Sequence, residues 1–261
     1  MKVALLQKRW TIRRIQNAII GRYKKLVFRP RIIDREIAGE RIRFLIGDLF
    51  GAGWYGPQHA PWPELEWIKN HGIRRGDVVI DCGANHGFTS LLFAKWAGNK
   101  GVVHAIEPWT HNVEILQENL RLNDITNVLI HQVAAGGRNG TAMLTDHHPN
   151  ATITEDVNER SISVKMRRLD DEISDEQVDF VKIDVEGFEI EVLKGLQRIL
   201  ADLPRLALEI HVFLYKDKIQ QLKELFGLLP MSKYIVEIQP EVDGPIISFD
   251  PARHTPQKLA N

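Results

Sequence analysis

The stretch Val78–Phe88, VVIDCGANHGF, is the part of the chain that best indicates its fold. It begins with an apolar run, typical of a strand buried on both faces, and ends with an acid and two glycines four residues apart. Residues 89–96 then have the pattern of an amphipathic helix. A strand, a glycine-rich turn and a helix in this order predict an open α/β sheet with a small-ligand site at the turn.

The spacing of the glycines argues against a dinucleotide at this turn. A dinucleotide fingerprint has glycines at its first, third and sixth positions, so that the backbone approaches a pyrophosphate. Counted from Gly83, the third position is Asn85 and the sixth is Phe88. A phosphate-binding loop that ends in Gly-Lys-Ser/Thr is also excluded, because Phe88 follows Gly87.

A second apolar strand, residues 101–106, ends at Glu107 and Pro108. Glu107 lies 24 positions after Gly83 (107 − 83). In a parallel sheet this places its carboxylate beside the turn, where the two hydroxyls of a ribose can donate to it. The sequence therefore predicts a nucleoside-containing ligand.

Four blocks of sequence in this order resemble the FkbM family of S-adenosylmethionine (SAM)-dependent methyltransferases, and they cover residues 77–211, about half of the chain. The blocks are Asp81-x-Gly-Ala-Asn-x-Gly87, then Glu107-Pro108 with Asn112, Leu116 and Asn119, then Lys182-x-Asp-Val-Glu-Gly-x-Glu189 with Val192-Leu-x-Gly195, and Glu209-x-His211. The third block is the most specific to the family. His86 departs from the family pattern, in which an aliphatic residue is more common.

The resemblance implies a Rossmann-like seven-stranded class I methyltransferase sheet with helices on both faces. It also implies that SAM is the donor and that particular residues hold it. The amino-acid part of SAM is assigned to Asp81, Gly83, Asn85 and Gly87, the ribose to Glu107, and the adenine to the backbone around Val133 and Ala134.

The predicted catalytic groups are polar residues at the ends of two further expected strands, residues 180–183 and 206–210. Because ligands of open α/β sheets lie beyond the carboxyl ends of the strands, Asp184, Glu186 and His211 are expected to meet in one crevice with Asp81 and Glu107. An alcohol that attacks the methyl group must lose its proton, and an imidazole titrates near neutrality. His211 is therefore the predicted general base, with Asp184 and Glu186 orienting it, positioning the hydroxyl or acting as base themselves.

A divalent metal is the mechanistic alternative. Glu209 and His211 lie two residues apart on a strand and so on one face, and with Asp184 they form a ligand set for Mg²⁺ or Mn²⁺. We do not favour it, because acids at strand ends are common without a metal. Lys182 lies one alternation before Asp184 and is expected to be a buried partner of one of these acids.

Apolar periodicity predicts the remaining elements. Residues 41–46 and 128–133 are expected to be strands, residues 51–57 a glycine-rich loop, and residues 63–71 and 112–122 helices. Further expected elements are short strands at 141–144 and 161–166 around a polar loop (146–160), core strands at 180–183 and 206–210, helices at 190–200 and 218–228, and a final strand pair at 234–238 and 245–249.

Composition fits one globular domain with an extension. The chain has 261 residues, 44% hydrophobic and 26% charged, enough for one full core. The single cysteine, Cys82, excludes an intramolecular disulfide and a cysteine metal site, and is expected to be a small buried residue. No segment approaches the ~20 apolar residues of a membrane span, and basic residues interrupt the N-terminal apolar pattern, so a cytoplasmic location is expected.

The neutral net charge conceals an asymmetry. Residues 1–33 hold ten Lys or Arg and no acid, which leaves 24 basic and 34 acidic residues in the rest, a net charge of −10. An approximate helical period in this segment predicts a basic amphipathic helix. We expect it to pack on the acidic domain as a lid or dimer arm; docking to an anionic membrane surface, an acidic glycan or a nucleic acid stays open. Residues 1–50 are assigned to this extension and 51–261 to the methyltransferase domain.

The resemblance suggests O-methylation of a hydroxyl on a small metabolite, a polyketide or a sugar within a glycan. Trp54, Tyr55, Trp109 and the loop with His147 and His148 are expected to shape the acceptor pocket. Nucleic acid is disfavoured as the acceptor, because Asp184-Val-Glu-Gly187 replaces the Asn/Asp-Pro-Pro-aromatic turn of amine methyltransferases and no cysteine is placed as a nucleophile for cytosine. A nucleic-acid methyltransferase that uses the basic N-terminus, a nicotinamide oxidoreductase and a non-catalytic nucleotide-binding module remain alternatives.

Overall fold

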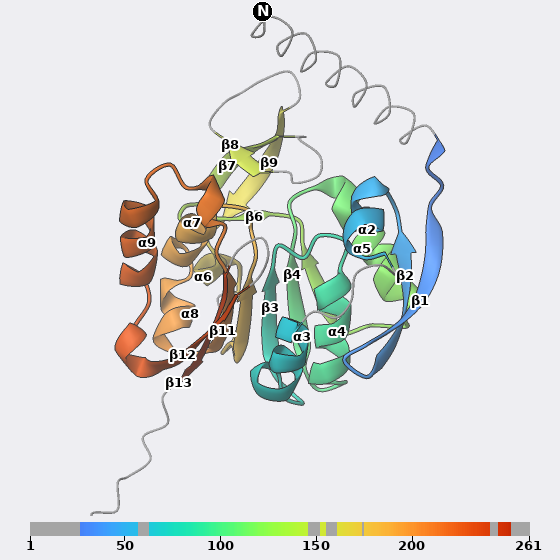
Figure 1. Ribbon diagram of the computed structural model, residues 1–261, viewed down its shortest axis with the longest axis horizontal. Helices are drawn as coiled ribbons and strands as arrows, with labels where there is room; N and C mark the ends of the chain where they lie inside the picture. The colour runs from blue at the N-terminus through green and yellow to red at the C-terminus, as the bar shows by residue number, and fades with distance from the viewer. Residues whose placement is uncertain are drawn as a thin grey trace, which may run out of the picture.

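The computed structural model describes residues 27–56, 63–145, 152–154, 161–173, 175–240 and 245–251. Its centre is a seven-stranded sheet with five parallel strands and an antiparallel pair at one edge (Figure 1). In spatial order the strands are β12 (Tyr234–Pro240), β13 (Pro245–Pro251), β11 (Arg205–Glu209), β10 (Phe180–Ile183), β3 (Val78–Cys82), β4 (Val102–Ile106) and β5 (Val128–His131). The chain order along the sheet reverses between β3 and β10, so a ligand crevice is expected beyond the carboxyl ends of these two strands.

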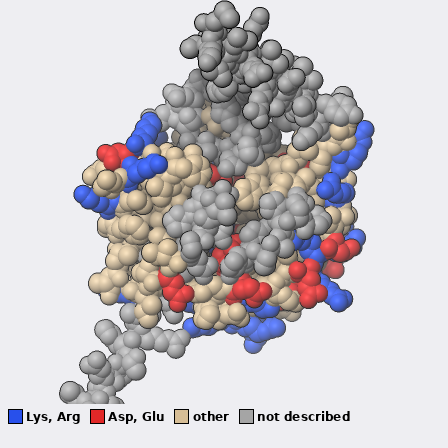
Figure 2. Space-filling model, in the orientation of Figure 1, with Lys and Arg blue, Asp and Glu red and all other residues tan. Residues whose placement is uncertain are grey.

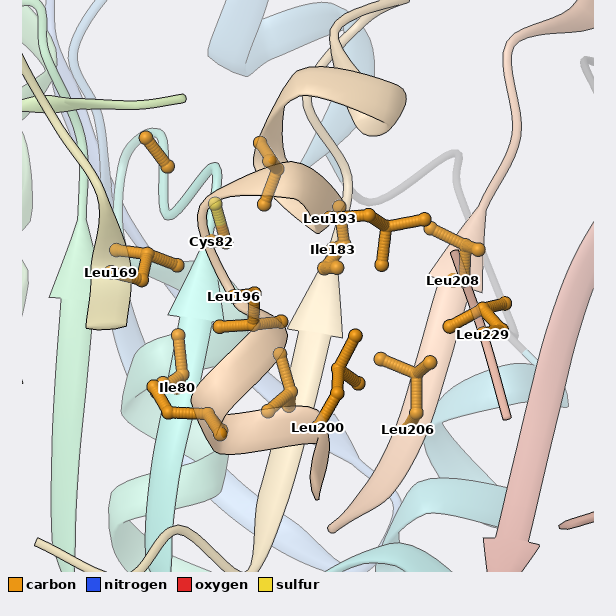
Figure 3. Packing of buried hydrophobic residues seen from close by; sticks show 14 of the residues in the cluster. Ile80, Cys82, Leu169, Ile183, Leu193, Leu196, Leu200, Leu206, Leu208 and Leu229 are labelled. Carbon is orange, nitrogen blue, oxygen red and sulfur yellow. The ribbon is translucent and has the colours of Figure 1, made fainter. Parts of the chain in front are cut away.

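Helices cover both faces of this sheet (Figure 1). Successive residues of β3 point to opposite faces. Val79 packs with the helix α4 (Phe88–Ala97), whereas Ile80 packs with α7 (Glu189–Lys194) and α8 (Gln197–Ala201). In Figure 3, Leu193, Leu196 and Leu200 from the α7–α8 segment lie over Ile80 and Ile183. The helices are α2 (Leu49–Trp54), α3 (Pro63–Trp67), the π-helical turn η1 (Ile68–Gly72), α4 (Phe88–Ala97), α5 (Thr110–Leu122), α6 (Leu169–Glu172), α7 (Glu189–Lys194), α8 (Gln197–Ala201), α9 (Lys218–Gly227) and the 3₁₀ turns η2 (Val212–Leu214) and η3 (Met231–Lys233).

A hairpin of β1 (Arg31–Ile37) and β2 (Glu40–Ile46) packs outside α4 and α5. Ala38 and Gly39 form its two-residue turn with φ of 47° and 75°, the positive values that a tight hairpin requires. Ile37, Ile42, Phe44 and Ile46 are buried in the same cluster as α4, although they precede the domain boundary predicted at residue 50. This cover explains why α4 is buried all round except at Thr89 and Lys95, rather than amphipathic as expected.

Two local expectations were wrong. Residues 51–57 were expected to be a loop, but α2 begins at Leu49 because the Asp48 side chain caps it by accepting from Gly51 N. The expected helix 190–200 is two helices: α7 ends at Gly195, where an added Cβ would lie 2.1 Å from Gly136 O. The helix expected at 63–71 is confirmed: α3 continues from Ile68 to Gly72 as the π-helical turn η1.

The strands predicted at 141–144 and 161–166 belong to a second sheet. This sheet has the order β6-β9-β7-β8, with β6 (Ala134–Ala135), β7 (Gly140–Thr145), β8 (Thr152–Thr154) and β9 (Ser161–Arg167). It rises from the end of β5 beside the carboxyl ends of the main sheet (Figure 1). The rest of the polar loop around β8, with His147 and His148, lies outside the described residues.

The predicted basic N-terminal helix lies largely outside the described residues, which begin at Val27. Where the description covers the predicted segment, Arg31–Ile33 belong to β1. In Figure 2, acidic side chains lie mainly along the lower part of the molecule with basic ones beside them, and further basic side chains lie at its upper left and right. Among the described residues, none of the helices has both the length and the apolar character that a membrane span needs.

Candidate active site

A cavity of about 410 Å³ opens at the carboxyl ends of β3, β4, β10 and β11. Eight of the ten residues predicted for the site line it, namely Gly83, Asn85, Glu107, Val133, Ala134, Asp184, Glu186 and His211. Trp54, Tyr55 and Trp109, expected near the acceptor, also line it. Five of the seven predicted donor residues and all three predicted catalytic residues thus line one cavity.

Asp81 and Gly87, the other two predicted residues, lie behind the wall of the cavity. Asp81 is fully buried, and its Oδ2 accepts from Thr89 Oγ1 at 2.8 Å and from Ser90 Oγ at 2.5 Å. Its Oδ1 has no hydrogen-bond partner and lies 3.9 Å from Lys182 Nζ. The carboxylate therefore links the end of β3 to the first helical turn of α4. It also adds negative charge beneath the loop Gly83–Gly87.

The turn after β3 depends on two glycines and on close contact with its neighbours. Gly83 has a φ of +86°, and a Cβ there would lie 1.8 Å from Asp184 O. Gly87 has a φ of +81°, and a Cβ there would lie 2.8 Å from Leu116 Cγ. Asn85 also takes a positive φ, 50°. Asparagine tolerates this left-handed region better than other non-glycine residues do.

The backbone N–H groups of this turn are engaged within the protein. Those of Gly83 and Ala84 donate to Ile106 O at 3.0 Å, and that of Gly87 donates to Ala84 O at 2.8 Å. Asn85 N donates to Glu107 Oε2 and His86 N to Asn85 Oδ1, at 2.9 and 2.7 Å. A pyrophosphate would need such N–H groups, whereas the ammonium of an amino acid is itself a donor. The engaged N–H groups are thus not available to an anion, which agrees with the prediction against a dinucleotide.

Glu107 is 5% exposed and is held by three donors at the end of β4. Its Oε1 accepts from Trp109 N at 2.9 Å and Asn112 Nδ2 at 3.2 Å, and its Oε2 accepts from Asn85 N at 2.9 Å. Burial raises the pKa of Glu107 to about 7, although these three hydrogen bonds oppose the shift. The carboxyl group is therefore fixed in direction and titrates near neutral pH.

This pKa makes nucleoside binding pH-dependent. Ribose hydroxyls donate to the ionised carboxylate, so protonation of Glu107 should compete with the ligand. We expect S-adenosylhomocysteine to bind about tenfold more weakly at pH 6 than at pH 8, the factor for a site that must lose a proton with a pKa of about 7. Isothermal titration calorimetry between pH 6 and pH 8 measures this change in affinity.

Glu107→Gln should weaken S-adenosylhomocysteine binding at pH 8 and remove its pH dependence. The amide would direct an N–H at a ribose hydroxyl that itself donates, and it does not titrate. The matched control is Glu118→Gln, which alters only a surface pair with Arg121 on α5. A pH dependence that persists in Glu107→Gln would contradict the assignment of the ribose to Glu107.

A cluster of acids with one histidine lines the cavity at the ends of β10 and β11. Glu186 lies in the turn after β10 with a φ of 51°, and His211 follows β11. His211 is 4% exposed, and its Nε2 lies 3.5 Å from Glu186 Oε2, 3.6 Å from Glu209 Oε1 and 3.8 Å from Asp184 Oδ1. The oxygen atoms of Asp184 and Glu186 and the ring of His211 are close enough to share a cation, with ligand atoms within 4.8 Å of one another.

Two positive groups lie among these acids. Lys182 Nζ donates to Asp184 Oδ2 at 3.0 Å, and the negative charges of Asp184 and Asp81 raise the pKa of Lys182 against the effect of burial. Lys182 is thus the buried ion-pair partner that the sequence predicted. Burial alone would lower the pKa of His211, but the hydrogen bond to Glu189 and the charges of Asp184, Glu186 and Glu209 raise it to about 9. Burial and the charge of Asp184 raise the pKa of Glu209.

Sequence reasoning did not assign the residues that hold the His211 ring. Glu189 is fully buried, and its Oε1 contacts His211 Nδ1 at 2.7 Å and accepts from Gly187 N at 2.9 Å. Its Oε2 accepts from Tyr215 Oη at 2.9 Å. Glu189 belongs to the sequence block that is most specific to the family, and this block was the signal that could have identified it. No sequence pattern pointed to Tyr215.

Comparison with known proteins agrees with this arrangement. A putative rRNA methylase from Clostridium thermocellum, a solved structure, aligns with a TM-score of 0.51 and 12% identity, over 73% of this chain and 94% of that one. The likeness is in the fold alone. Together with the parallel sheet whose strand order reverses between β3 and β10, this likeness shows the fold of the class I methyltransferases.

The family follows from residues 81–238, which match the methyltransferase FkbM domain; the chain belongs to this family. Two fungal proteins are similar to it. Methyltransferase 1 of Beauveria bassiana (strain ARSEF 2860) is 26% identical over 45% of this chain and 57% of its own length. Methyltransferase sdnD of Sordaria araneosa is 26% identical over 61% of this chain and 71% of its own length.

Proposed function

We propose that this protein transfers the methyl group of SAM to a hydroxyl of a small metabolite, a polyketide or a sugar. The observation that supports it best is that one cavity is lined by Glu107, suited to a ribose, and by His211 among carboxylates, suited to an alcohol. SAM supplies the electrophile, and the protein must hold the hydroxyl, the methyl carbon and the sulfur in line.

In the proposed arrangement the turn Gly83–Gly87 carries the amino-acid part of SAM, and Glu107 accepts from its ribose. The backbone at Val133 and Ala134 lines the adenine. His211 takes the proton of the acceptor at Nε2, while its Nδ1–H donates to Glu189, which fixes the ring. Asp184 and Glu186 position the hydroxyl. A resident metal on these residues stays a prediction that we do not favour, since Lys182 and His211 already offset part of the negative charge.

The charge of the cavity wall favours a neutral acceptor over a nucleic acid. Asp184 and Glu186 line the cavity beside His211, and their negative charges would repel a phosphate backbone. For the basic segment 1–33 we propose a role in docking to a membrane surface, a glycan or a second copy of the chain.

Titration calorimetry of the full chain tests the donor. We expect micromolar binding of S-adenosylhomocysteine and none of NAD⁺ in a parallel titration. A screen of alcohol acceptors with methyl-labelled SAM then tests the acceptor class, with His211→Gln as the blank. NAD⁺ binding without S-adenosylhomocysteine binding would overturn the donor assignment, and labelling of RNA but of no alcohol would overturn the acceptor class.

A further inference from the structure

A second cluster of ligand-type side chains lies beside the donor end of the cavity. Asp48 precedes α2, His86 belongs to the turn after β3, and His111 is in the first turn of α5. Asp48 Oδ2 lies 3.1 Å from His111 Nε2 and 3.6 Å from His86 Nε2, and the three ligand atoms lie within 4.8 Å of one another. Figure 1 shows α2 beside α5, which brings these distant parts of the chain together.

His86 is the unusual member of this cluster. Its side chain is fully buried, and neither ring nitrogen has a hydrogen-bond partner. A neutral imidazole has one donor and one acceptor, and leaving both unmet in the interior is costly. Aromatic rings enclose it, with the centroids of Phe50 and Tyr55 both 5.8 Å away. Its Nε2 lies 3.6 Å from Asp48 Oδ2, and an ion bound between these two atoms would give Nε2 the partner that it lacks.

The other two residues are oriented for the same point. Asp48 Oδ1 accepts from Gly51 N at 2.7 Å, and this bond directs Oδ2 towards the two histidines. Against the effect of burial, the contact with His86 and the hydrogen bonds from Gly51 N and His111 lower the pKa of Asp48, so Asp48 is a carboxylate. The His111 side chain is 40% exposed, which gives an ion a way in from solvent.

We propose that Asp48, His86 and His111 bind a divalent transition-metal ion of the zinc class. Zinc bonds of about 2.0–2.2 Å to nitrogen and oxygen place tetrahedral ligand atoms about 3.4 Å apart, close to the 3.1 and 3.6 Å found here. Two imidazoles and one carboxylate suit Zn²⁺ better than Mg²⁺, which prefers oxygen ligands. Three protein ligands leave a fourth position for water, as zinc sites of this composition often do.

The ion would fasten a wall of the cavity. Asp48 caps α2, and α2 and the residue after it bring Phe50, Trp54 and Tyr55 to the cavity lining. His86 belongs to the turn that approaches the donor, so a bound ion would cross-link this wall to the turn and to α5. We expect zinc to raise the melting temperature of the full chain and to tighten S-adenosylhomocysteine binding several-fold.

The test is zinc binding by the full chain after treatment with a chelator and dialysis, in competition with a chromophoric zinc indicator. We expect the wild type to bind one equivalent with a Kd of micromolar or below, and His111→Ala to lose it with at least a hundredfold weaker binding. His111 is the residue to change, because its side chain is partly exposed and the helix cap of Asp48 stays intact; circular dichroism checks the fold. Cobalt(II) in place of zinc should give the visible absorption of a tetrahedral ion in the wild type but not in His111→Ala.

Two controls separate this site from others. Glu186→Gln disrupts the acid cluster around His211, and His71→Ala removes an exposed histidine on η1. Both should keep the equivalent that His111→Ala loses. The proposal is overturned if the wild type takes up no zinc, if His111→Ala binds it as the wild type does, or if Glu186→Gln loses it.

Discussion

Gly83→Ala is expected to abolish S-adenosylhomocysteine binding and to lower the stability of the fold. The new Cβ would lie 1.8 Å from Asp184 O, and Gly83 has a φ of +86°, which costs a residue with a side chain about 1–2 kcal/mol. The turn and the end of β10 would have to separate, and both line the cavity. Calorimetric titration and thermal unfolding measure the two effects, and we expect at least a hundredfold loss of affinity.

Two further glycines separate the causes. Gly76→Ala introduces a side chain at a similar φ, +92°, but into open space, so it should cost about 1 kcal/mol and leave binding unchanged. Gly195→Ala introduces a Cβ 2.1 Å from Gly136 O, at a position that does not line the cavity. It should destabilise the chain while the folded fraction still binds. If Gly83→Ala binds like the wild type, the turn is not the donor site.

His211→Gln is expected to slow methyl transfer by about 10²–10⁴-fold, the usual contribution of a general base, and to leave S-adenosylhomocysteine affinity within a few-fold. The base must be neutral to accept a proton, and its pKa is raised to about 9. The wild-type rate should therefore rise about tenfold per pH unit from pH 7 towards 9 and level off above it. Single-turnover assays with labelled SAM measure this profile.

The variant should lose this rise with pH, because glutamine does not titrate. His71→Gln, at an exposed position on η1, should keep both the rate and the profile. A wild-type rate that is flat between pH 7 and 9 would show that His211 acts as a fixed imidazolium. Asp184 or Glu186 would then be the group that takes the proton.

Much of the fold could be predicted because its signals are local. The five parallel strands of the main sheet are short apolar runs, and each was placed within two residues of its observed bounds. The tight turn at Gly83 and Gly87 was also predicted from the local sequence, and the positive φ of both residues explains why glycine stands there. The β1–β2 hairpin was only partly foreseen, because the basic pattern before it suggested that the helix reaches residue 33.

The sequence by itself determined the order of the elements, the positions of the tight turns and the strand ends at which polar groups collect. Backbone periodicity and turn chemistry depend on neighbours in the chain, so the printed residues carry them. Only the tertiary structure decided that Glu189 holds the ring of His211, that Gly83 contacts Asp184 O, and that His86 meets Asp48 and His111. These contacts join residues about 20 to 100 positions apart, and they form only when the packing of sheet and helices fixes the distance between them.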